Sequence, residues 1–377
     1  MECTIGGTRR HLAQLAHGLR KDRFDVIVAA SAERDATFRE DLQAMAKAGC
    51  RVEEIPMVRS IDRRRDLEHL KALRKLIREI RPEIVHTHSS KAGALGRTAS
   101  SLEGIGRRVH TPHTFAFAFA GGFSMGKRAL FYGIERALGR LTDRLICVSA
   151  SEAEQAQRLR IVSQGRIRVI PNGVDPEPFR RSPSRAEARR SLGWSAKRPI
   201  ALLVALWNPA KGQLEACEAW ARIPAERRPL LVLAGAVSDE AYGAEVRSAI
   251  ERLKLTDSIL PLGHRRDIPL LLAAADFVIV PSRWEGMPYS VLEAMAAGRA
   301  VLATATNGSR DAVVDGSTGI LVSVGDVDSL AAHARRLASD SAECRRLGDA
   351  GRARVLTEFT IDTMLERTMA LYDEVCA

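Results

Sequence analysis

The sequence predicts an α/β protein built from two doubly wound parallel sheets. Short apolar runs alternate with stretches of helical periodicity along nearly the whole chain, which is the pattern of repeated strand–helix–strand units. The 377 residues also exceed what one hydrophobic core usually holds. Prolines, an asparagine and a glycine at 171–178 interrupt the pattern and indicate a connection between two domains.

The first half carries five apolar runs that we predict to be buried strands. Helical stretches separate them, so consecutive strands are expected to run parallel. The predicted strands cover residues 26–30, 52–57, 84–88, 109–113 and 145–149, and the helices between them include 8–20, 62–81 and 151–160.

The second half repeats this order. We predict strands at 200–206, 230–234, 259–262, 277–280 and 300–303, and helices near 212–222, 239–253, 267–275 and 290–297. We expect an N-terminal domain at 1–175, a second domain at 176–355, and a C-terminal helix within 356–377 that could pack back on the first domain. Two such domains would bind ligand between the carboxyl ends of their strands.

One strand of this pattern is missing from the first half. The helix expected at 8–20 follows a Gly6-Gly7 turn, yet only five residues precede that turn and they form no apolar run. A sheet of this kind has its first strand at the centre, where about five buried side chains contribute ~1.5–3 kcal/mol each. We therefore expect that strand on roughly ten residues upstream of Met1.

The net charge of +11 lies entirely in the first half. Residues 1–175 carry 31 Lys and Arg against 20 Asp and Glu, whereas residues 176–377 carry 26 of each. A one-sided basic surface favours an anionic partner, and we expect a membrane surface rather than nucleic acid because no RNA-binding signature is present. The alternative is that part of the excess is only the solvated face of the helix at 62–81.

No apolar run approaches the roughly 20 residues of a membrane span, and nothing at the start resembles a signal peptide. The six cysteines are scattered, which argues against a disulfide framework or a thiolate zinc site. We expect a cytoplasmic protein that is peripheral at the inner face of the plasma membrane.

The most informative segment is residues 281–299, which joins a predicted strand to a predicted helix. Gly286 and Pro288 break the strand, so the amides of the following helix and the positive end of its dipole should point toward the strand end. Glu285 and Glu293 bracket this turn and can accept hydrogen bonds from sugar hydroxyls. Together these groups suit a nucleotide sugar. The alternative is a capping box, in which Glu293 only closes the first helical turn.

Two further turns place phosphate-binding groups at strand-to-helix junctions. Lys211 follows a predicted strand and opens a helix, where its ammonium can neutralise a phosphate. Gly6 and Gly7 lack side chains, so backbone amides in their turn can approach a phosphate closely.

Four histidines end two consecutive predicted strands of the first half. His86 and His88 lie on one face of their strand, and His110 and His113 flank the end of the next, so their imidazoles should gather at the edge that lines the cleft. Zinc is conceivable, but no carboxylate or cysteine is positioned nearby. We favour one histidine that orients a substrate hydroxyl, with His113 best placed, while His86 and His110 are expected to be satisfied strand residues.

An alternating aromatic stretch follows His113. It forms either a buried strand or a mobile loop that offers Phe115, Phe117 and Phe119 to a lipid-linked acceptor. In the second case, His88 and Lys91 would complete the acceptor side of the site.

The motifs together resemble the retaining glycosyltransferases of family four, which have the GT-B fold, and most closely those that build bacterial surface polysaccharides. Residues 281–298 contain the E-x7-E signature of that family, in which the two glutamates are Glu285 and Glu293. The likeness covers nearly the entire chain and rests on Gly6-Gly7-Thr-Arg-Arg-His-Leu, His86-Thr-His-Ser-Ser-Lys-Ala-Gly93, His110-Thr-Pro-His113, Val169-Ile-Pro-Asn-Gly-Val-Asp175, Lys211-Gly212 and Pro281 through Gly298.

The resemblance implies a role for each matched position. Glu285 would contact the donor sugar, Lys211 the diphosphate and His113 the sugar at its reacting face. The other donor contacts would be Gly6, Gly7, Gly286, Met287, Pro288, Tyr289, Glu293 at the ribose, and His264 near the base. The resemblance also implies a reaction without metal or other cofactor, because cationic and N–H groups absorb the charge of the leaving diphosphate.

We expect a hexosyltransferase that moves a sugar from a nucleotide-sugar donor to a lipid-linked or polysaccharide acceptor in bacterial cell-surface glycan synthesis. The sequence departs from the family at Leu206, where an arginine is usual five positions before Lys211, and Arg283 could supply the missing charge. The alternatives are a sugar-nucleotide epimerase of the same fold and an inactive nucleotide-sugar-binding homologue, which the loss of that arginine would favour.

Overall fold

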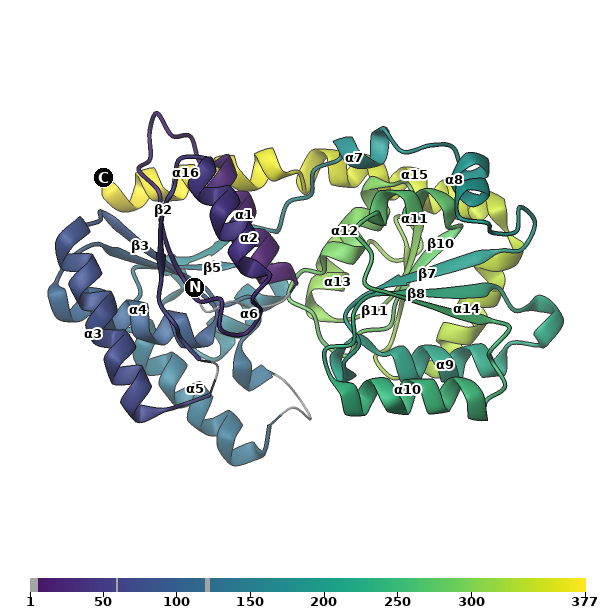
Figure 1. The fold of residues 1–377 in the computed structure, drawn as a ribbon, viewed down its shortest axis with the longest axis horizontal. Helices are drawn as coiled ribbons and strands as arrows, with labels where there is room; N and C mark the ends of the chain where they lie inside the picture. Colours follow the sequence, from purple (N-terminus) through teal and green to yellow (C-terminus); the bar gives the residue numbers. More distant parts are fainter. Residues whose placement is uncertain (1–5, 59, 119–122) are drawn as a thin grey trace. The chain divides into compact units, whose positions relative to one another are not determined.

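The computed structural model describes residues 6–58, 60–118 and 123–377, and the chain forms two compact units (Figure 1). Unit 1 comprises residues 1–172 and 361–377, and unit 2 comprises residues 173–360. The last helix, α16 (Ile361–Cys376), belongs to unit 1, where Met364 and Leu365 are buried in an apolar cluster with Val109 and Ile146. No helix among the described residues is both long and apolar enough to cross a membrane.

Unit 1 contains two parallel sheets. The smaller pairs β1 (Ile27–Ala30) with β2 (Arg51–Glu54). The larger has the order β3 (Ile84–His88), β4 (Arg107–Thr111), β5 (Arg144–Cys147) and β6 (Ile167–Val169). Among the described residues no strand joins β1 to β3.

The helices of unit 1 form where apolar residues recur at helical spacing and a polar residue caps the start. In α3 (Arg63–Ile80), the Asp62 side chain accepts hydrogen bonds from two backbone amides, and Leu73 and Ile77 are buried one turn apart. The other helices are α1 (Gly7–Gly18), α2 (Phe38–Lys47), α4 (Ser90–Glu103), α5 (Met125–Gly139) and α6 (Ala150–Arg158), with short 3₁₀ turns η1 (Ala116–Ala118) and η2 (Gln164–Arg166).

Unit 2 is built on one six-stranded parallel sheet of order β12-β11-β10-β7-β8-β9. The order reverses between β7 and β10, because β8 and β9 extend the sheet in one direction and β11 and β12 in the other. Such a switch point leaves a crevice outside the carboxyl ends of the strands. The strands are β7 (Ile200–Val204), β8 (Leu230–Ala234), β9 (Ile259–Gly263), β10 (Phe277–Val280), β11 (Ala300–Thr304) and β12 (Ile320–Val322).

Helices cover the unit 2 sheet, so its central strands are uninterrupted apolar runs. All four residues of β10 are buried, and the fully buried Trp220 of α9 (Gln213–Arg222) donates its indole N–H to the Pro229 carbonyl at 3.0 Å. The other helices are α7 (Glu177–Arg180), α8 (Arg185–Ser191), α10 (Glu240–Arg252), α11 (Ile268–Ala274), α12 (Tyr289–Ala296), α13 (Asn307–Ala312), α14 (Val327–Ser339) and α15 (Ser341–Glu358), with 3₁₀ turns η3 (Pro209–Lys211) and η4 (Ala225–Arg227).

The predicted fold class is confirmed, since each unit alternates strands and helices around parallel sheets. The strands expected at 84–88, 230–234 and 277–280 have the predicted bounds. The strand expected at 52–57 ends at Glu54, and the one expected at 109–113 ends at Thr111, because the prolines at 56 and 112 cannot donate to a ladder. The three-residue strands β6 and β12 were not predicted.

Candidate functional site

Two predicted phosphate-binding loops of unit 2 meet at the switch point. β7 leads into the loop that carries Lys211, and β10 leads into the turn that carries Glu285. The two strands pair directly, so both loops leave the same edge of the sheet. Gly212 has a φ of 71°, and a Cβ there would lie 2.0 Å from the Pro281 carbonyl oxygen. Only glycine permits this close approach of the two loops.

Lys211 and Glu285 form an ion pair across these loops. The Lys211 ammonium donates to Glu285 Oε1 at 2.7 Å, and the Ser282 hydroxyl donates to the same oxygen at 2.8 Å. The Lys211 side chain is 26% exposed and that of Glu285 is 11% exposed, so a ligand can reach both. The site therefore offers a cation for a phosphate and a carboxylate for a hydroxyl.

The turn after Glu285 is held by its neighbours. The Gly308 amide of α13 donates to the Glu285 carbonyl at 3.3 Å, and a Cβ on Gly308 would lie 2.1 Å from the Gly286 carbonyl oxygen. Met287 and Tyr289 are buried at 5% and 8% exposure, so their side chains anchor the turn.

The alternative of a capping box at the start of α12 is wrong. The N-cap residue is Pro288 and no side chain caps this helix, so Glu293 does not close its first turn with Ser290. The helix begins at Tyr289, one residue earlier than predicted, and Glu293 lies half-buried within it.

Three other residues of unit 2 that the sequence singled out are not part of this ion pair. His264 is exposed just beyond β9, the edge strand two positions from β7. The Arg283 guanidinium pairs with Glu215, although its backbone amide donates to the Ala210 carbonyl at 2.9 Å beside Lys211. Leu206 is half-buried and offers no charge to the loop. Lys211 is therefore the cation that the described structure places beside Glu285.

In unit 1, three histidines come together at the carboxyl ends of β3 and β4. His88 Nδ1 and His113 Nε2 are hydrogen-bonded at 3.2 Å, and the His11 ring of α1 lies with its centroid 4.7 Å from that of His113. One ring nitrogen of each residue lies within 4.8 Å of the other two, a spacing that a metal ion could bridge. His11 Nδ1 also hydrogen-bonds with Asn172 Oδ1 at 3.1 Å.

Of the other two predicted histidines, His86 is a satisfied strand residue, as expected. His110 is satisfied only through Nδ1, because its buried Nε2 has no hydrogen-bond partner among the described residues. His86 hydrogen-bonds with the Tyr372 hydroxyl at 2.6 Å and with the Thr111 hydroxyl at 2.8 Å. His110 Nδ1 hydrogen-bonds with the Thr87 hydroxyl at 2.9 Å, and His110 is fully buried. These contacts fix β3 and β4 and leave His88 and His113 at the open end of the sheet.

Burial keeps the histidines of this cluster neutral. Desolvation lowers the pKa of His11 to about 4 and that of His86 to about 3. Repulsion from a charge on His11 also contributes to the lowered pKa of His86. Desolvation also lowers the pKa of His88 and of His113 well below the usual value. Near neutral pH the cluster therefore presents neutral imidazoles, which can donate one hydrogen bond and accept another.

The backbone after β4 is strained where it presents His113. His113 has a φ of 54° and Thr114 a φ of 86°, a conformation that costs side-chain-bearing residues about 1–3 kcal/mol each. Glu152 holds this loop, because its carboxylate accepts from the Thr114 amide at 2.7 Å and from the Val148 amide at 2.8 Å. Glu152 is 2% exposed, so this clamp is buried.

Gly6 and Gly7 lie at the start of α1. Gly6 is the N-cap, with φ 92° and ψ −135°, a conformation open to glycine only, and no side chain caps the helix. Both glycines are exposed, and the first turn of α1 contains no acidic residue. The start of α1 therefore presents the positive end of its dipole, which favours an anion.

Three predictions for the acceptor side need correction. Lys91 is ion-paired with Asp66 and its side chain is 9% exposed, so its ammonium serves the packing of α3 on α4. Phe115 and Phe117 are 1% and 6% exposed, with rings stacked 5.0 Å apart in a core cluster, so they are not presented to an acceptor. Phe119 lies outside the described residues.

Sequence reasoning missed three residues of the unit 1 site. His11 and Asn172 stand inside segments that carried the family resemblance, and their spacing of 161 residues concealed their contact. Glu152 follows the Ser149 N-cap of α6 by three residues and is indistinguishable in sequence from an ordinary capping glutamate. Its role becomes visible only through the two amides that it binds.

Comparison with known proteins agrees with the fold. Residues 5–178 match the family described as Glycosyltransferase Family 4, and residues 184–354 match the family described as Glycosyl transferases group 1. Together with the fold, these matches define a glycosyltransferase with the GT-B fold that uses a nucleotide-sugar donor.

Two relatives are similar over most of the chain. The chain is 33% identical over 281 residues to the UDP-Gal:alpha-D-GlcNAc-diphosphoundecaprenol alpha-1,3-galactosyltransferase of Escherichia coli, covering 72% of this chain and 70% of the relative. It is 31% identical over 310 residues to the putative glycosyltransferase EpsD of Bacillus subtilis, covering 80% and 79%. The chain belongs to glycosyltransferase family 4, which confirms the resemblance seen in the sequence.

A solved structure shows the same fold. The Anabaena protein HepE, in complex with UDP, superimposes with a TM-score of 0.83 over 98% of this chain and 97% of that protein, at 22% sequence identity. At this identity the likeness concerns the fold.

Proposed function

We propose that the protein transfers a hexose from a UDP-sugar to a lipid-diphosphate-linked sugar during assembly of a bacterial surface glycan. The observation that carries the proposal is the pairing of Lys211 with Glu285 at the switch point of unit 2. A diphosphate is an anion that Lys211 can bind in place of the Glu285 carboxylate. The Glu285 carboxylate can then accept hydrogen bonds from the hydroxyls of a sugar.

The choice of donor and acceptor draws on the similar proteins. The E. coli relative is named for a UDP-galactose donor and a diphosphoundecaprenol-linked acceptor, and the HepE structure holds UDP. A UDP-sugar and a lipid-diphosphate acceptor are therefore the substrates we propose here.

In the proposed reaction, the residues of unit 2 hold the leaving group. Lys211 and the amides of the 286–289 turn stabilise the negative charge that develops on the diphosphate as the bond to the sugar breaks. Glu285 orients the sugar through its hydroxyls, and Glu293 contacts the ribose. The acceptor oxygen bonds to the anomeric carbon on the face that the diphosphate leaves, and the departing diphosphate oxygen takes the proton of the acceptor hydroxyl. The anomeric configuration is therefore retained.

The histidines of unit 1 are proposed to position a sugar. A neutral His113 can donate a hydrogen bond to a sugar hydroxyl without bringing a positive charge to the sugar. His88 and His11 fix the orientation of its ring, and Glu152 fixes its backbone. We assign to this cluster the positioning of the sugar rather than a metal, in keeping with the expected reaction without cofactor.

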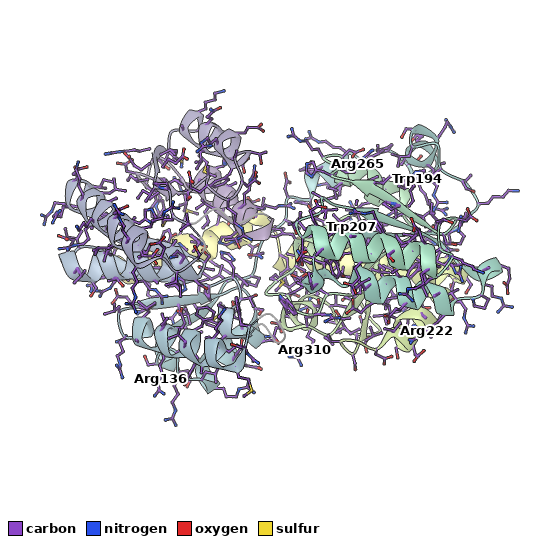
Figure 2. All side chains as sticks on the ribbon, turned by 60° about the horizontal axis from the view of Figure 1, so that its bottom comes forward. Arg136, Trp194, Trp207, Arg222, Arg265 and Arg310 are labelled. Carbon is purple, nitrogen blue, oxygen red and sulfur yellow. The ribbon has the colours of Figure 1, made fainter. Side chains whose placement is uncertain are left out.

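Association with a membrane surface is part of the proposal. Helix α5 exposes Met125, Leu130 and Ile134, and Leu130 and Ile134 lie one turn apart on the same face. The exposed Lys127 and Arg136 lie on this helix, with Arg136 at its surface in Figure 2. Exposed apolar side chains beside cations are the combination that binds an anionic lipid surface.

Acceptor-dependent release of UDP tests the function. The full-length protein is incubated with UDP-galactose or UDP-glucose, with and without undecaprenyl-diphosphate-linked N-acetylglucosamine, and free UDP and extended lipid are measured. Release of UDP together with a longer lipid product supports the transferase. Interconversion of the sugar nucleotide without acceptor would identify the epimerase, and binding without either reaction would identify the inactive homologue.

A further inference from the structure

The three histidines at the end of the unit 1 sheet have the spacing of ligands around one tetrahedral metal ion. Two imidazole nitrogens that lie about 2.0–2.1 Å from the same zinc ion are about 3.3 Å apart, and the centroids of their rings are roughly 5 Å apart. His88 Nδ1 and His113 Nε2 are 3.2 Å apart. The ring centroid of His11 lies 4.7 Å from that of His113 and 5.5 Å from that of His88, and the centroids of His88 and His113 are 5.5 Å apart.

Asn172 determines which nitrogen of His11 faces a metal. An amide oxygen only accepts hydrogen bonds, so the contact of 3.1 Å between His11 Nδ1 and Asn172 Oδ1 requires a proton on Nδ1. The lone pair of the neutral His11 ring is then on Nε2. Histidines that bind metals commonly donate their second ring N–H to an oxygen in this way, which fixes the orientation of the ring.

The fold holds the three side chains in place before any ligand binds. His11 is buried within α1, and His88 is the last residue of β3, where it pairs with Thr111 of β4. Glu152 clamps the loop that presents His113 through its hydrogen bond to the Thr114 amide. Ligands that are already ordered lose little conformational entropy on binding, which favours affinity.

The ligand atoms select the kind of ion. Among the described residues, this group consists of His11, His88 and His113, without a carboxylate or a cysteine. Imidazole nitrogens suit Zn²⁺, Cu²⁺ and Ni²⁺, whereas Mg²⁺, Ca²⁺ and Mn²⁺ prefer oxygen ligands. Three histidines around zinc leave the fourth tetrahedral position for water or another oxygen.

We propose that His11, His88 and His113 form an inhibitory binding site for a divalent transition-metal ion, with Zn²⁺ as the best match. The inhibition rests on the proposed function, in which an uncharged His113 contacts the sugar. The ion occupies a ring nitrogen of His113 and brings two positive charges to a group that the proposed reaction uses as a neutral imidazole. The ion is an inhibitor and not a cofactor, so the reaction itself still proceeds without metal.

Binding of Zn²⁺ to the full-length, metal-free protein tests the site independently of activity. Isothermal titration calorimetry in buffer without chelator is expected to show one Zn²⁺ per chain that depends on the cluster. His11→Gln removes one ligand and should weaken this binding at least tenfold. His17→Gln is the matched control, since His17 is an exposed histidine of the same helix, and this variant should bind Zn²⁺ as the original protein does.

Co²⁺ provides a second measurement on the original protein if His11→Gln does not fold. Tetrahedral Co²⁺ absorbs visible light much more strongly than octahedral Co²⁺. We expect strong absorption that saturates at one equivalent and disappears when Zn²⁺ displaces Co²⁺. A weak spectrum of the octahedral kind at saturation, or unchanged Zn²⁺ binding in a folded His11→Gln variant, would overturn the site.

Inhibition is measured as the acceptor-dependent release of UDP. Saturating Zn²⁺ should slow the release at least tenfold, EDTA should restore it, and the same concentration of Mg²⁺ should leave it unchanged. Zn²⁺ bound at the cluster without slower transfer would overturn the inhibition and the contact of His113 with the sugar. A metal-free protein that transfers no sugar, but binds Zn²⁺ through His11, would refute the proposed function and support the metal site.

Discussion

The ammonium of Lys211 and Oε1 of Glu285 lie 2.7 Å apart, on loops that follow the adjacent strands β7 and β10. The pair occupies the point where the order of the unit 2 sheet reverses, and the Ser282 hydroxyl also donates to this carboxylate oxygen. The ion pair holds the cation in place before substrate arrives. A diphosphate can then replace the carboxylate as the partner of Lys211, which frees Glu285 to accept from the sugar.

Glu285→Gln is expected to impair turnover without unfolding the protein. The amide keeps the shape of the side chain but loses its charge, so kcat/KM should fall about 10²–10³-fold, as for other single electrostatic groups in active sites. The Tm should change by less than about 3 °C because the pair is partly exposed. Steady-state kinetics and calorimetry measure the two effects.

Arg283→Gln is the matched control, since Arg283 is in the same turn but its guanidinium is paired with Glu215. We expect less than about a threefold change in kcat/KM, the effect of a surface ion pair worth up to ~0.6 kcal/mol. A loss as large as that of Glu285→Gln would show that Arg283 replaces the arginine absent at Leu206. A large drop in Tm for Glu285→Gln would instead assign that residue to stability.

Glu152→Gln is expected to lower kcat through His113. The carboxylate binds two backbone amides beside the strained residues, and an amide side chain can accept from only one of them. One buried amide left without its partner costs about 1–3 kcal/mol. We expect kcat to fall at least tenfold, with less effect on KM, and kinetics of the variant measure this split. Glu154→Gln, on the exposed face of the same helix, should leave both unchanged.

Retention of full kcat by Glu152→Gln would contradict the positioning role. A Tm loss with unchanged kcat would have the same meaning, because the clamp would then serve stability alone.

Much of the unit 2 site was predictable because it depends on local sequence. Residues 281–293 contain a buried strand, a break and a helix start in succession, and Lys211 has the same strand-to-turn context. Elements predicted from such short-range patterns differ from the structure by only a residue or so. The helix α12, for example, begins at Tyr289, one residue before its predicted start. The predictions that failed concerned where long-range packing directs a side chain.

Lys91 and Phe117 illustrate that limit. In the sequence, Lys91 lies near the start of a helix and close to two histidines. In the structure its ammonium donates a hydrogen bond to the carboxylate of Asp66, which lies 25 residues earlier. Phe117 belongs to an alternating stretch that fits a loop or a strand, and only its stacking on Phe115 in the core decides the matter. The contact of His11 with His113 likewise depends on how α1 is placed on the sheet.

The stability of unit 1 is expected to fall as the pH drops below 6.5. His11 and His86 have folded pKa values of about 4 and about 3, below the unfolded value near 6.5. Between these values the unfolded chain takes up protons that the folded chain excludes, so their contribution is complete above pH 6.5 and is lost toward pH 4. The loss for the two residues is on the order of 3 kcal/mol between pH 6.5 and 5.

Urea unfolding followed by circular dichroism at several pH values measures this loss. The four tryptophans, Trp194, Trp207, Trp220 and Trp284, all lie in unit 2, so their fluorescence reports that unit separately. His11→Gln should reduce the pH slope of unit 1 stability by about 1.4 kcal/mol per pH unit. If the free energy of unfolding changed with pH equally in the variant and in the original protein, the assignment of a neutral buried His11 would be refuted.

Charge substitution on α5 should weaken membrane binding. Leu130→Glu combined with Ile134→Glu removes two exposed apolar side chains and places anions beside the lipid surface. We expect binding to vesicles with 30% phosphatidylglycerol to weaken at least tenfold, since each buried apolar side chain contributes ~1.5–3 kcal/mol. Co-sedimentation measures the change. Leu356→Glu, at an exposed leucine of unit 2, is the control, and equal binding of both variants would remove α5 from the proposal.

The most direct test of the account is the affinity for UDP measured by isothermal titration calorimetry in EDTA, because Lys211 beside Glu285 is proposed to hold the diphosphate without a metal. The account predicts saturable binding that weakens at least tenfold in Lys211→Ala, about 1.4 kcal/mol or more. Lys197→Ala, which removes an exposed lysine elsewhere in unit 2, should bind as the original protein does. UDP binding that is unchanged in Lys211→Ala, or that appears only when a divalent metal is restored, would contradict the central claim.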